Sequence, residues 1–121
     1  MGLDIYFDKV TKEAHELAYF RKVNFLVAFF ENLGYEIENC GEVVIEKEDI
    51  EELLSRCKQV LENKELATEL LPTTEGFFFG STEYDEYYFQ DVEQVKDTCE
   101  ELIPEFDELN GNQYIVFKIW Y

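Results

Sequence analysis

Histidine and cysteine, the side chains that most often bind transition metals or act as nucleophiles, are scarce in this sequence. His15 is the single histidine among 121 residues, which excludes a multi-histidine metal centre. The three cysteines, Cys40, Cys57 and Cys99, are odd in number and far apart, so they fit neither a disulfide framework nor a zinc site. The sequence also contains no P-loop, dinucleotide fingerprint or nucleophile elbow. We therefore expect no metal, no cofactor, no catalytic residues and no enzymatic activity.

Basic residues are also few. Ten lysines and arginines face 28 aspartates and glutamates, which gives a formal net charge of -18. Such a surface repels phosphate backbones and anionic membranes, so we expect no direct binding of nucleic acid or of a membrane. Residues 1–8 lack the basic and apolar regions of a leader peptide, and the longest apolar run, residues 25–30, is too short for a membrane span. The expected location is the cytoplasm.

Apolar residues, by contrast, are plentiful. They make up 46% of the chain and aromatic residues 17%, so the sequence can bury a core despite its charge. The length is that of one ordinary domain. We expect residues 1–121 to fold as a single unit.

Three segments are predicted to form the sheet. Apolar and polar residues alternate at residues 3–8, phenylalanines lie between two glycines at residues 76–80, and β-prone residues fill residues 113–121. Shorter β-prone stretches at residues 35–37 and 42–46 fit either a hairpin or a lead into the next helix.

Helical spacing of apolar residues predicts three main helices, at residues 13–33, 47–63 and 91–103. A short helix at residues 64–71 is expected to stop before Pro72. Strands at both ends of the chain with helices between them indicate an α+β fold, in which a mixed or antiparallel sheet is packed by these helices.

Acidic residues are concentrated between residues 75 and 108, where twelve acids accompany a single base, Lys96. This surface either keeps the protein soluble or steers a basic partner towards it. Tyrosines interleave with the acids and are typical interface anchors, although some of their rings must cover the core. The expected partner-binding residues are Glu75, Glu83, Tyr84, Asp85, Glu86, Tyr87, Tyr88, Asp91 and Glu93.

Several blocks of the chain resemble a family of small phage and prophage proteins. The blocks are MGLDIY at residues 1–6, YFRKVN at 19–24, LLPT at 70–73, GFFFGS at 76–81 and YDEYY at 84–88. The resemblance implies a phage or prophage setting and a second constellation of polar residues. That constellation comprises Asp4, Tyr6, Arg21, Lys22 and Asn24, which would join Tyr84, Asp85, Glu86 and Tyr87 around one pocket.

Two functions follow as hypotheses. The first is a phage- or prophage-derived acidic inhibitor that occupies the basic nucleic-acid groove of a host defence nuclease, as an anti-CRISPR protein does with a CRISPR effector, in the cytoplasm of an infected bacterium. The second is a protein that binds or sequesters a small nucleotide-like ligand, or a small enzyme, using Arg21, Lys22 and residues 84–88. A concave pocket on which Arg21 and Tyr87 converge would favour the second function, whereas a convex acidic ridge would favour the first. An internal ion pair of Arg21 with Asp85 is the structural alternative.

The last predicted strand is apolar on both of its faces. If helices cover one face, Trp120 and Tyr121 should lie at the edge of the other. There they would be available for a homodimer contact or for the target.

Overall fold

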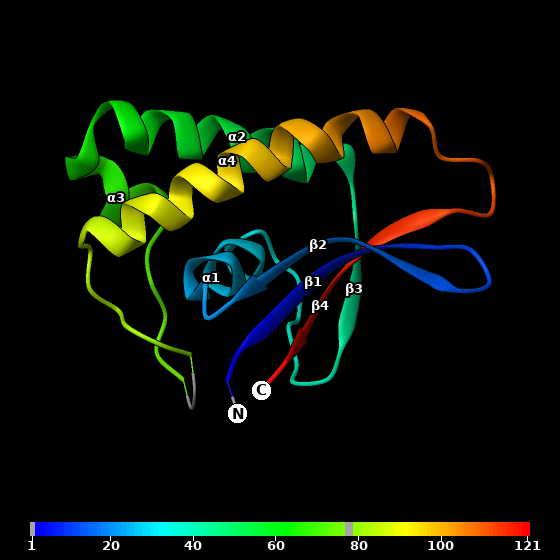
Figure 1. Ribbon diagram of the computed structural model, residues 1–121, viewed down its shortest axis with the longest axis horizontal. Helices are drawn as coiled ribbons and strands as arrows, with labels where there is room; N and C mark the ends of the chain where they lie inside the picture. Colours follow the sequence, from blue (N-terminus) through cyan, green and yellow to red (C-terminus); the bar gives the residue numbers. More distant parts are fainter. Residues whose placement is uncertain (1, 77–78) are drawn as a thin grey trace.

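The computed structural model describes residues 2–76 and 79–121 and shows an α+β fold in which helices cover one face of a sheet (Figure 1). The sheet of the described residues has four strands in the order β2-β1-β4-β3, and every neighbouring pair is antiparallel. The strands are β1 (Asp4–Val10), β2 (Ala14–Arg21), β3 (Glu42–Ile45) and β4 (Tyr114–Trp120). The predicted fold class is therefore confirmed, with an antiparallel rather than a mixed sheet.

The prediction of one long helix at residues 13–33 is wrong, because the first half of this segment forms strand β2. β1 and β2 form a hairpin whose register shifts at Phe7 and Asp8, so that Leu17 is the extra residue of a bulge. The bulge interrupts the alternation of apolar and polar residues that would have identified a strand. The helical spacing of apolar residues is only a weak indicator of a helix, and here pairing with β1 outweighs it.

Helix α1 (Asn24–Asn32) forms from the second half of that segment and is buried almost all round. Its Phe30 ring packs on Phe117 of the sheet with centroids 4.3 Å apart. On the opposite side Phe25 packs edge-on against Tyr88, at 5.4 Å. α1 therefore lies between the sheet and an outer helix layer, which is the central position predicted from its apolar surface (Figure 1).

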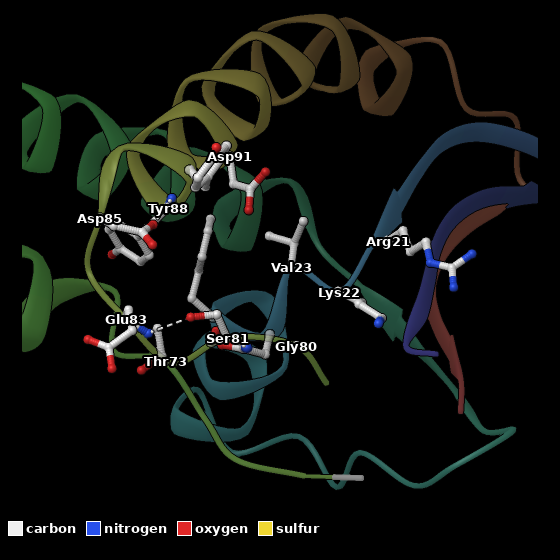
Figure 2. Close-up of a pocket in the computed structure, with 13 residues that line it drawn as sticks. Arg21, Lys22, Val23, Thr73, Gly80, Ser81, Glu83, Asp85, Tyr88 and Asp91 are labelled. Carbon is white, nitrogen blue, oxygen red and sulfur yellow. Dashed lines mark hydrogen bonds between the residues drawn. The ribbon is translucent and has the colours of Figure 1, made fainter. Parts of the chain in front are cut away.

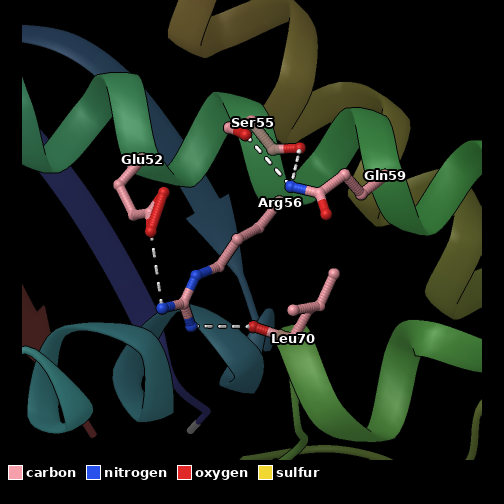
Figure 3. A network of polar contacts seen from close by, with 5 residues as sticks. All are labelled: Glu52, Ser55, Arg56, Gln59 and Leu70. Atoms are coloured by element: carbon pink, nitrogen blue, oxygen red, sulfur yellow. Dashed lines mark hydrogen bonds and ion pairs between the residues drawn. The ribbon is translucent and has the colours of Figure 1, made fainter.

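The outer layer consists of α2 (Lys47–Glu62) and α4 (Glu86–Asp107), which pack side by side, with the short helices η1 (Lys64–Leu66) and α3 (Ala67–Leu70) between them in sequence. Figure 3 shows how Arg56 of α2 connects this helix with Leu70 of α3. Its guanidinium donates to the Leu70 carbonyl at 3.1 Å, lies 3.7 Å from Glu52 and stacks over the Phe29 ring. No helix of the described chain is both long and apolar enough to cross a membrane.

Helix α4 is longer than the predicted helix at residues 91–103. It begins at Glu86 because the Asp85 carboxylate accepts the Tyr88 N–H at 3.1 Å and so caps the helix. It also continues through Pro104 to Asp107, since a proline in the last turns removes only one hydrogen bond at an exposed position. The connection between α3 and α4 therefore ends at Asp85.

Of the strand predicted at residues 76–80, the structure describes three residues, and none of these belongs to the sheet. Residues 77 and 78 lie outside the described residues, and Gly76, Phe79 and Gly80 have no regular secondary structure. Phe79 is nevertheless buried and packs against the Tyr121 ring at 4.8 Å. The sheet instead includes β2, where a helix was predicted, and β3, whose residues were predicted only as a β-prone stretch that fits either a hairpin or a lead into the next helix.

The sheet face opposite the helices carries exposed aromatic side chains. Trp120 is 60% exposed there, as predicted, whereas Tyr121 packs against Phe79 instead. Strand β4 pairs with β1 on one side and with β3 on the other. Its backbone groups are therefore used within the sheet, and a second molecule can contact β4 only through side chains.

Candidate functional site

A cavity of about 260 Å³ opens where three parts of the chain meet: the corner between β2 and α1, the loop after α3, and the start of α4 (Figure 2). The residues that line the cavity are Arg21, Lys22, Val23, Asn24, Phe25, Thr73, Gly80, Ser81, Glu83, Asp85, Tyr87, Tyr88 and Asp91.

Backbone strain marks the corner between β2 and α1. Lys22 has a φ of 60°, a left-handed conformation that costs a side-chain-bearing residue roughly 1–2 kcal/mol. Its N–H donates to the Leu3 carbonyl at 2.7 Å, which holds the turn. Gly80 packs directly over it: a Cβ on Gly80, where φ is 89°, would lie 3.0 Å from the Lys22 Cβ. Strain of this kind is often found at binding sites.

The two cations of the cavity lie together near the chain's N-terminal segment. A Cβ on Gly2 would lie 2.9 Å from the Lys22 Cε and 3.2 Å from an Arg21 guanidinium nitrogen, so both side chains extend past the Gly2 backbone. Both are exposed, and neither forms an ion pair with any acid of the described residues. The ion pair of Arg21 with Asp85 considered above is therefore not formed, and Figure 2 shows the two cations turned away from Asp85.

Asn24 holds the loop that forms the floor of the cavity. It is 3% exposed, and its amide donates to the carbonyls of Phe79 and Ser81 at 3.1 and 2.9 Å. Its side-chain oxygen accepts the Thr74 N–H at 3.2 Å. Because these contacts occupy both amide hydrogens, Asn24 positions the loop and has little left to offer a ligand.

The tyrosines of residues 84–88 have different roles. The Tyr84 hydroxyl accepts the Thr73 N–H at 3.0 Å, and the buried Tyr88 donates to the Leu71 carbonyl at 2.7 Å. These two rings therefore fix the loop and cover the core. Tyr87 is 67% exposed and lies at the cavity, which leaves it as the tyrosine of this group that can contact a ligand or partner.

The wall formed by α4 is acidic. The Asp85 carboxylate caps the helix, and Asp91 lies two turns further along it, half-buried. Burial, with a smaller contribution from the charge on Asp85, raises the pKa of Asp91 above its ordinary value of 3.8. Glu83 is exposed at the mouth, where its N–H donates to the Ser81 hydroxyl (Figure 2).

The structure brings only part of the expected constellation together. Arg21, Lys22 and Asn24 do line the cavity with Asp85 and Tyr87, but Tyr84 and Glu86 do not line it. Two further residues lie elsewhere, on the sheet face opposite the helices. There Asp4 accepts a hydrogen bond from the Tyr19 hydroxyl, and the Tyr6 ring packs between Tyr19 and Lys118.

The expected partner-binding surface is acidic and mostly exposed. Five of its acids are exposed and form no ion pair within the described residues; they are Glu75, Glu83, Asp85, Glu86 and Glu93. Tyr88 is buried beneath this surface and is not available to a partner.

Five lining residues were not among the expected site residues: Val23, Phe25, Thr73, Gly80 and Ser81. The adjacent Gly-Ser pair directly after the phenylalanines was the available signal, since glycine permits the close backbone approach that Gly80 makes to Lys22.

Comparison of the chain with protein-family models, with curated proteins and with solved structures gave no match. The fold and the cavity therefore define an α+β protein with a candidate binding site.

Proposed function

We propose that this protein binds a small anionic, nucleotide-like ligand in the cavity between the β2–α1 corner and the start of α4. The observation that carries the proposal is a concave site with two unpaired, exposed cations, Arg21 and Lys22, on one side and the exposed Tyr87 ring at another. Guanidinium and ammonium groups hold a phosphate, and a tyrosine ring stacks on a base.

The size of the cavity favours a small molecule. Its volume of about 260 Å³ lies just below the range of roughly 300–1,000 Å³ that is usual for drug-sized ligands. A nucleoside monophosphate that projects partly into solvent fits such a site better than a dinucleotide or an extended polymer does.

The overall charge of -18 opposes the approach of an anion, but this effect acts at long range. At 0.1 M salt, exposed charges more than about 10 Å apart are largely screened. Arg21 and Lys22 then set the potential where the phosphate would lie, because their side chains extend together past Gly2.

The test compares the binding of nucleoside monophosphates and of the corresponding nucleosides by isothermal titration calorimetry. The wild type should bind the monophosphates at least about tenfold more tightly, since charge-assisted hydrogen bonds to the phosphate contribute about 1.5–3 kcal/mol each. The double variant Arg21→Ala/Lys22→Ala should lose this preference, whereas Lys12→Ala, at an exposed lysine in the β1–β2 turn, should retain it. Equal affinity of the wild type for both sets would overturn the proposal.

A second candidate is the phage- or prophage-derived inhibitor that binds a basic nucleic-acid groove of a host defence nuclease, such as a CRISPR effector. It is favoured by the exposed, unpaired acids around Tyr87, because an acidic face with an aromatic anchor suits a basic protein surface. Under this proposal the protein acts in the cytoplasm of the infected host and has no catalytic role.

This second candidate predicts a complex that depends on salt. Association with a captured partner should slow markedly between about 50 and 500 mM salt, because long-range attraction is lost as the Debye length shortens. Reversal of Glu75, Glu83, Glu86 and Glu93 to lysine should abolish binding and leave the thermal melting of the protein nearly unchanged, since all four are exposed. Association rates that do not change with salt would remove this candidate.

A further inference from the structure

Five carboxylates of the described chain are buried or half-buried, and four of them have a hydrogen-bond or ion-pair partner. Asp8 pairs with Lys118 at 3.3 Å and Glu105 with Lys9 at 3.0 Å. Asp4 accepts the Tyr19 hydroxyl at 2.5 Å, and Asp49 accepts the Glu46 N–H at 2.9 Å. The fifth, Asp91, forms no hydrogen bond or ion pair with any described residue, and its carboxylate oxygens reach solvent at the cavity.

Asp91 is also the carboxylate of this group that lines the cavity. Its side chain projects from α4 into the space above the β2–α1 corner (Figure 2). Partial burial, with a smaller contribution from the charge of Asp85, disfavours the ionised form of Asp91, in agreement with its raised pKa. A ligand that supplies hydrogen-bond donors at this point would favour the ionised carboxylate.

We propose, on the basis of the function proposed above, that Asp91 reads the base of the bound nucleotide and selects a base edge with adjacent N–H donors, as guanine has. An ionised carboxylate accepts hydrogen bonds through both of its oxygens and donates none. Guanine offers an N–H and an amino group side by side, which matches the two oxygens. Hypoxanthine offers the N–H alone, and adenine has an acceptor nitrogen beside its amino group, which the carboxylate repels.

The position of Asp91 relative to the cations suits this assignment. Arg21 and Lys22 extend towards Gly2, away from α4, so the cations and the acidic wall lie on different sides of the cavity, and a nucleotide whose phosphate contacts the cations reaches Asp91 with its base end. Tyr87 belongs to the same helix and lies at the same cavity, where its exposed ring can stack on the base. A metal ion is a weaker explanation, because no group of three or more metal-binding side chains occurs within residues 2–76 and 79–121.

The experiment measures the affinity of the full chain for GMP, IMP and AMP by isothermal titration calorimetry. The order GMP, then IMP, then AMP is expected, with about tenfold between successive ligands, since a site with an unpaired acceptor rejects analogues that lack the donor. Asp91→Asn should compress the three affinities to within a few-fold, because an amide presents one donor and one acceptor. Glu101→Gln, which removes the same charge from an exposed position of the same helix outside the cavity, should keep the wild-type order.

Each outcome separates the two proposals. Equal binding of the three monophosphates, or a preference for GMP that persists in Asp91→Asn, overturns the inference about Asp91. Neither result contradicts the proposed binding of a nucleotide phosphate by Arg21 and Lys22. If the wild type binds none of the three, both the inference and the proposed function fail.

Discussion

At the scale of single residues, the most informative position is Lys22, which is both strained and at the candidate site. Its left-handed backbone places the side chain beside Arg21 and against Gly80. A glycine at this position would adopt the same backbone without a steric cost. Lysine therefore costs stability here, and under the proposed function the charged group that it supplies compensates for this cost.

We predict that Lys22→Gly is more stable than Lys22→Ala by about 1 kcal/mol, because alanine keeps the left-handed strain and glycine relieves it. Both variants should lose affinity for nucleotides equally, since both remove the ammonium group. Urea denaturation measures the first effect and calorimetry the second. An alanine variant as stable as the glycine variant would show that the corner is not strained.

Asp91 provides a prediction of pH dependence. Its pKa is raised in the folded protein, so over the pH range just above 3.8 the folded state binds more protons than the unfolded state, and stability falls as the pH rises. Asp91→Asn should therefore be more stable than the wild type at pH 7, and the difference should shrink as the pH falls to 3.8 and below. Thermal melting at several pH values measures it.

The control for this measurement is Glu93→Gln, whose exposed side chain should change stability by less than about 0.5 kcal/mol at either pH. A stabilisation by Asp91→Asn that is independent of pH would show that the charge of Asp91 is not its cause.

At the scale of elements, the site depends on how the loop after α3 is fastened to α1. Asn24→Ala removes three hydrogen bonds and leaves the carbonyls of Phe79 and Ser81 without this donor. We predict a loss of about 2–4 kcal/mol in the free energy of unfolding, together with weaker nucleotide binding. Asn32→Ala, at the exposed end of the same helix, should cost less than about 0.5 kcal/mol. Equal effects of the two variants would mean that the hydrogen bonds of Asn24 to the loop do not contribute to stability.

Elements that carry their own local signal could be predicted from the sequence. Helix α2 matches its prediction at residues 47–63 to within one residue, because Ile50, Leu53, Cys57 and Val60 form one buried stripe. Strand β2 could not be predicted, since the bulge at Leu17 hides its alternation and its partner is another strand.

The candidate site was predictable to a similar extent. Arg21, Lys22, Asp85 and Tyr87 were expected at one pocket and all line the cavity. Asp4 was misplaced because alternate residues of a strand point to opposite faces, and the sequence does not say which face the helices cover. The lack of a partner for Asp91 depends on residues distant in sequence and so had no sequence signal.

At the scale of the whole molecule, charge and exposed apolar surface act against each other. The net charge of -18 keeps copies apart, while Trp120, Val44 and Tyr19 are exposed on strands of one sheet. We predict that self-association through this face increases as salt screens the repulsion, and that Trp120→Glu abolishes it. Sedimentation equilibrium measures the mass. A wild type that remains monomeric up to 1 M salt would exclude a homodimer through this face.

The central claim is that the cavity at the β2–α1 corner is a nucleotide site, and a heteronuclear NMR titration of the full chain with GMP tests it most directly. We expect the largest backbone amide shifts at Lys22, Gly80, Ser81, Tyr87 and Asp91, which line the cavity, and none at His15 or Val44, which are exposed on strands away from it. Arg21→Ala/Lys22→Ala should remove these shifts. Saturable shifts centred on the sheet face around Trp120, or the absence of shifts at millimolar GMP, would contradict the claim.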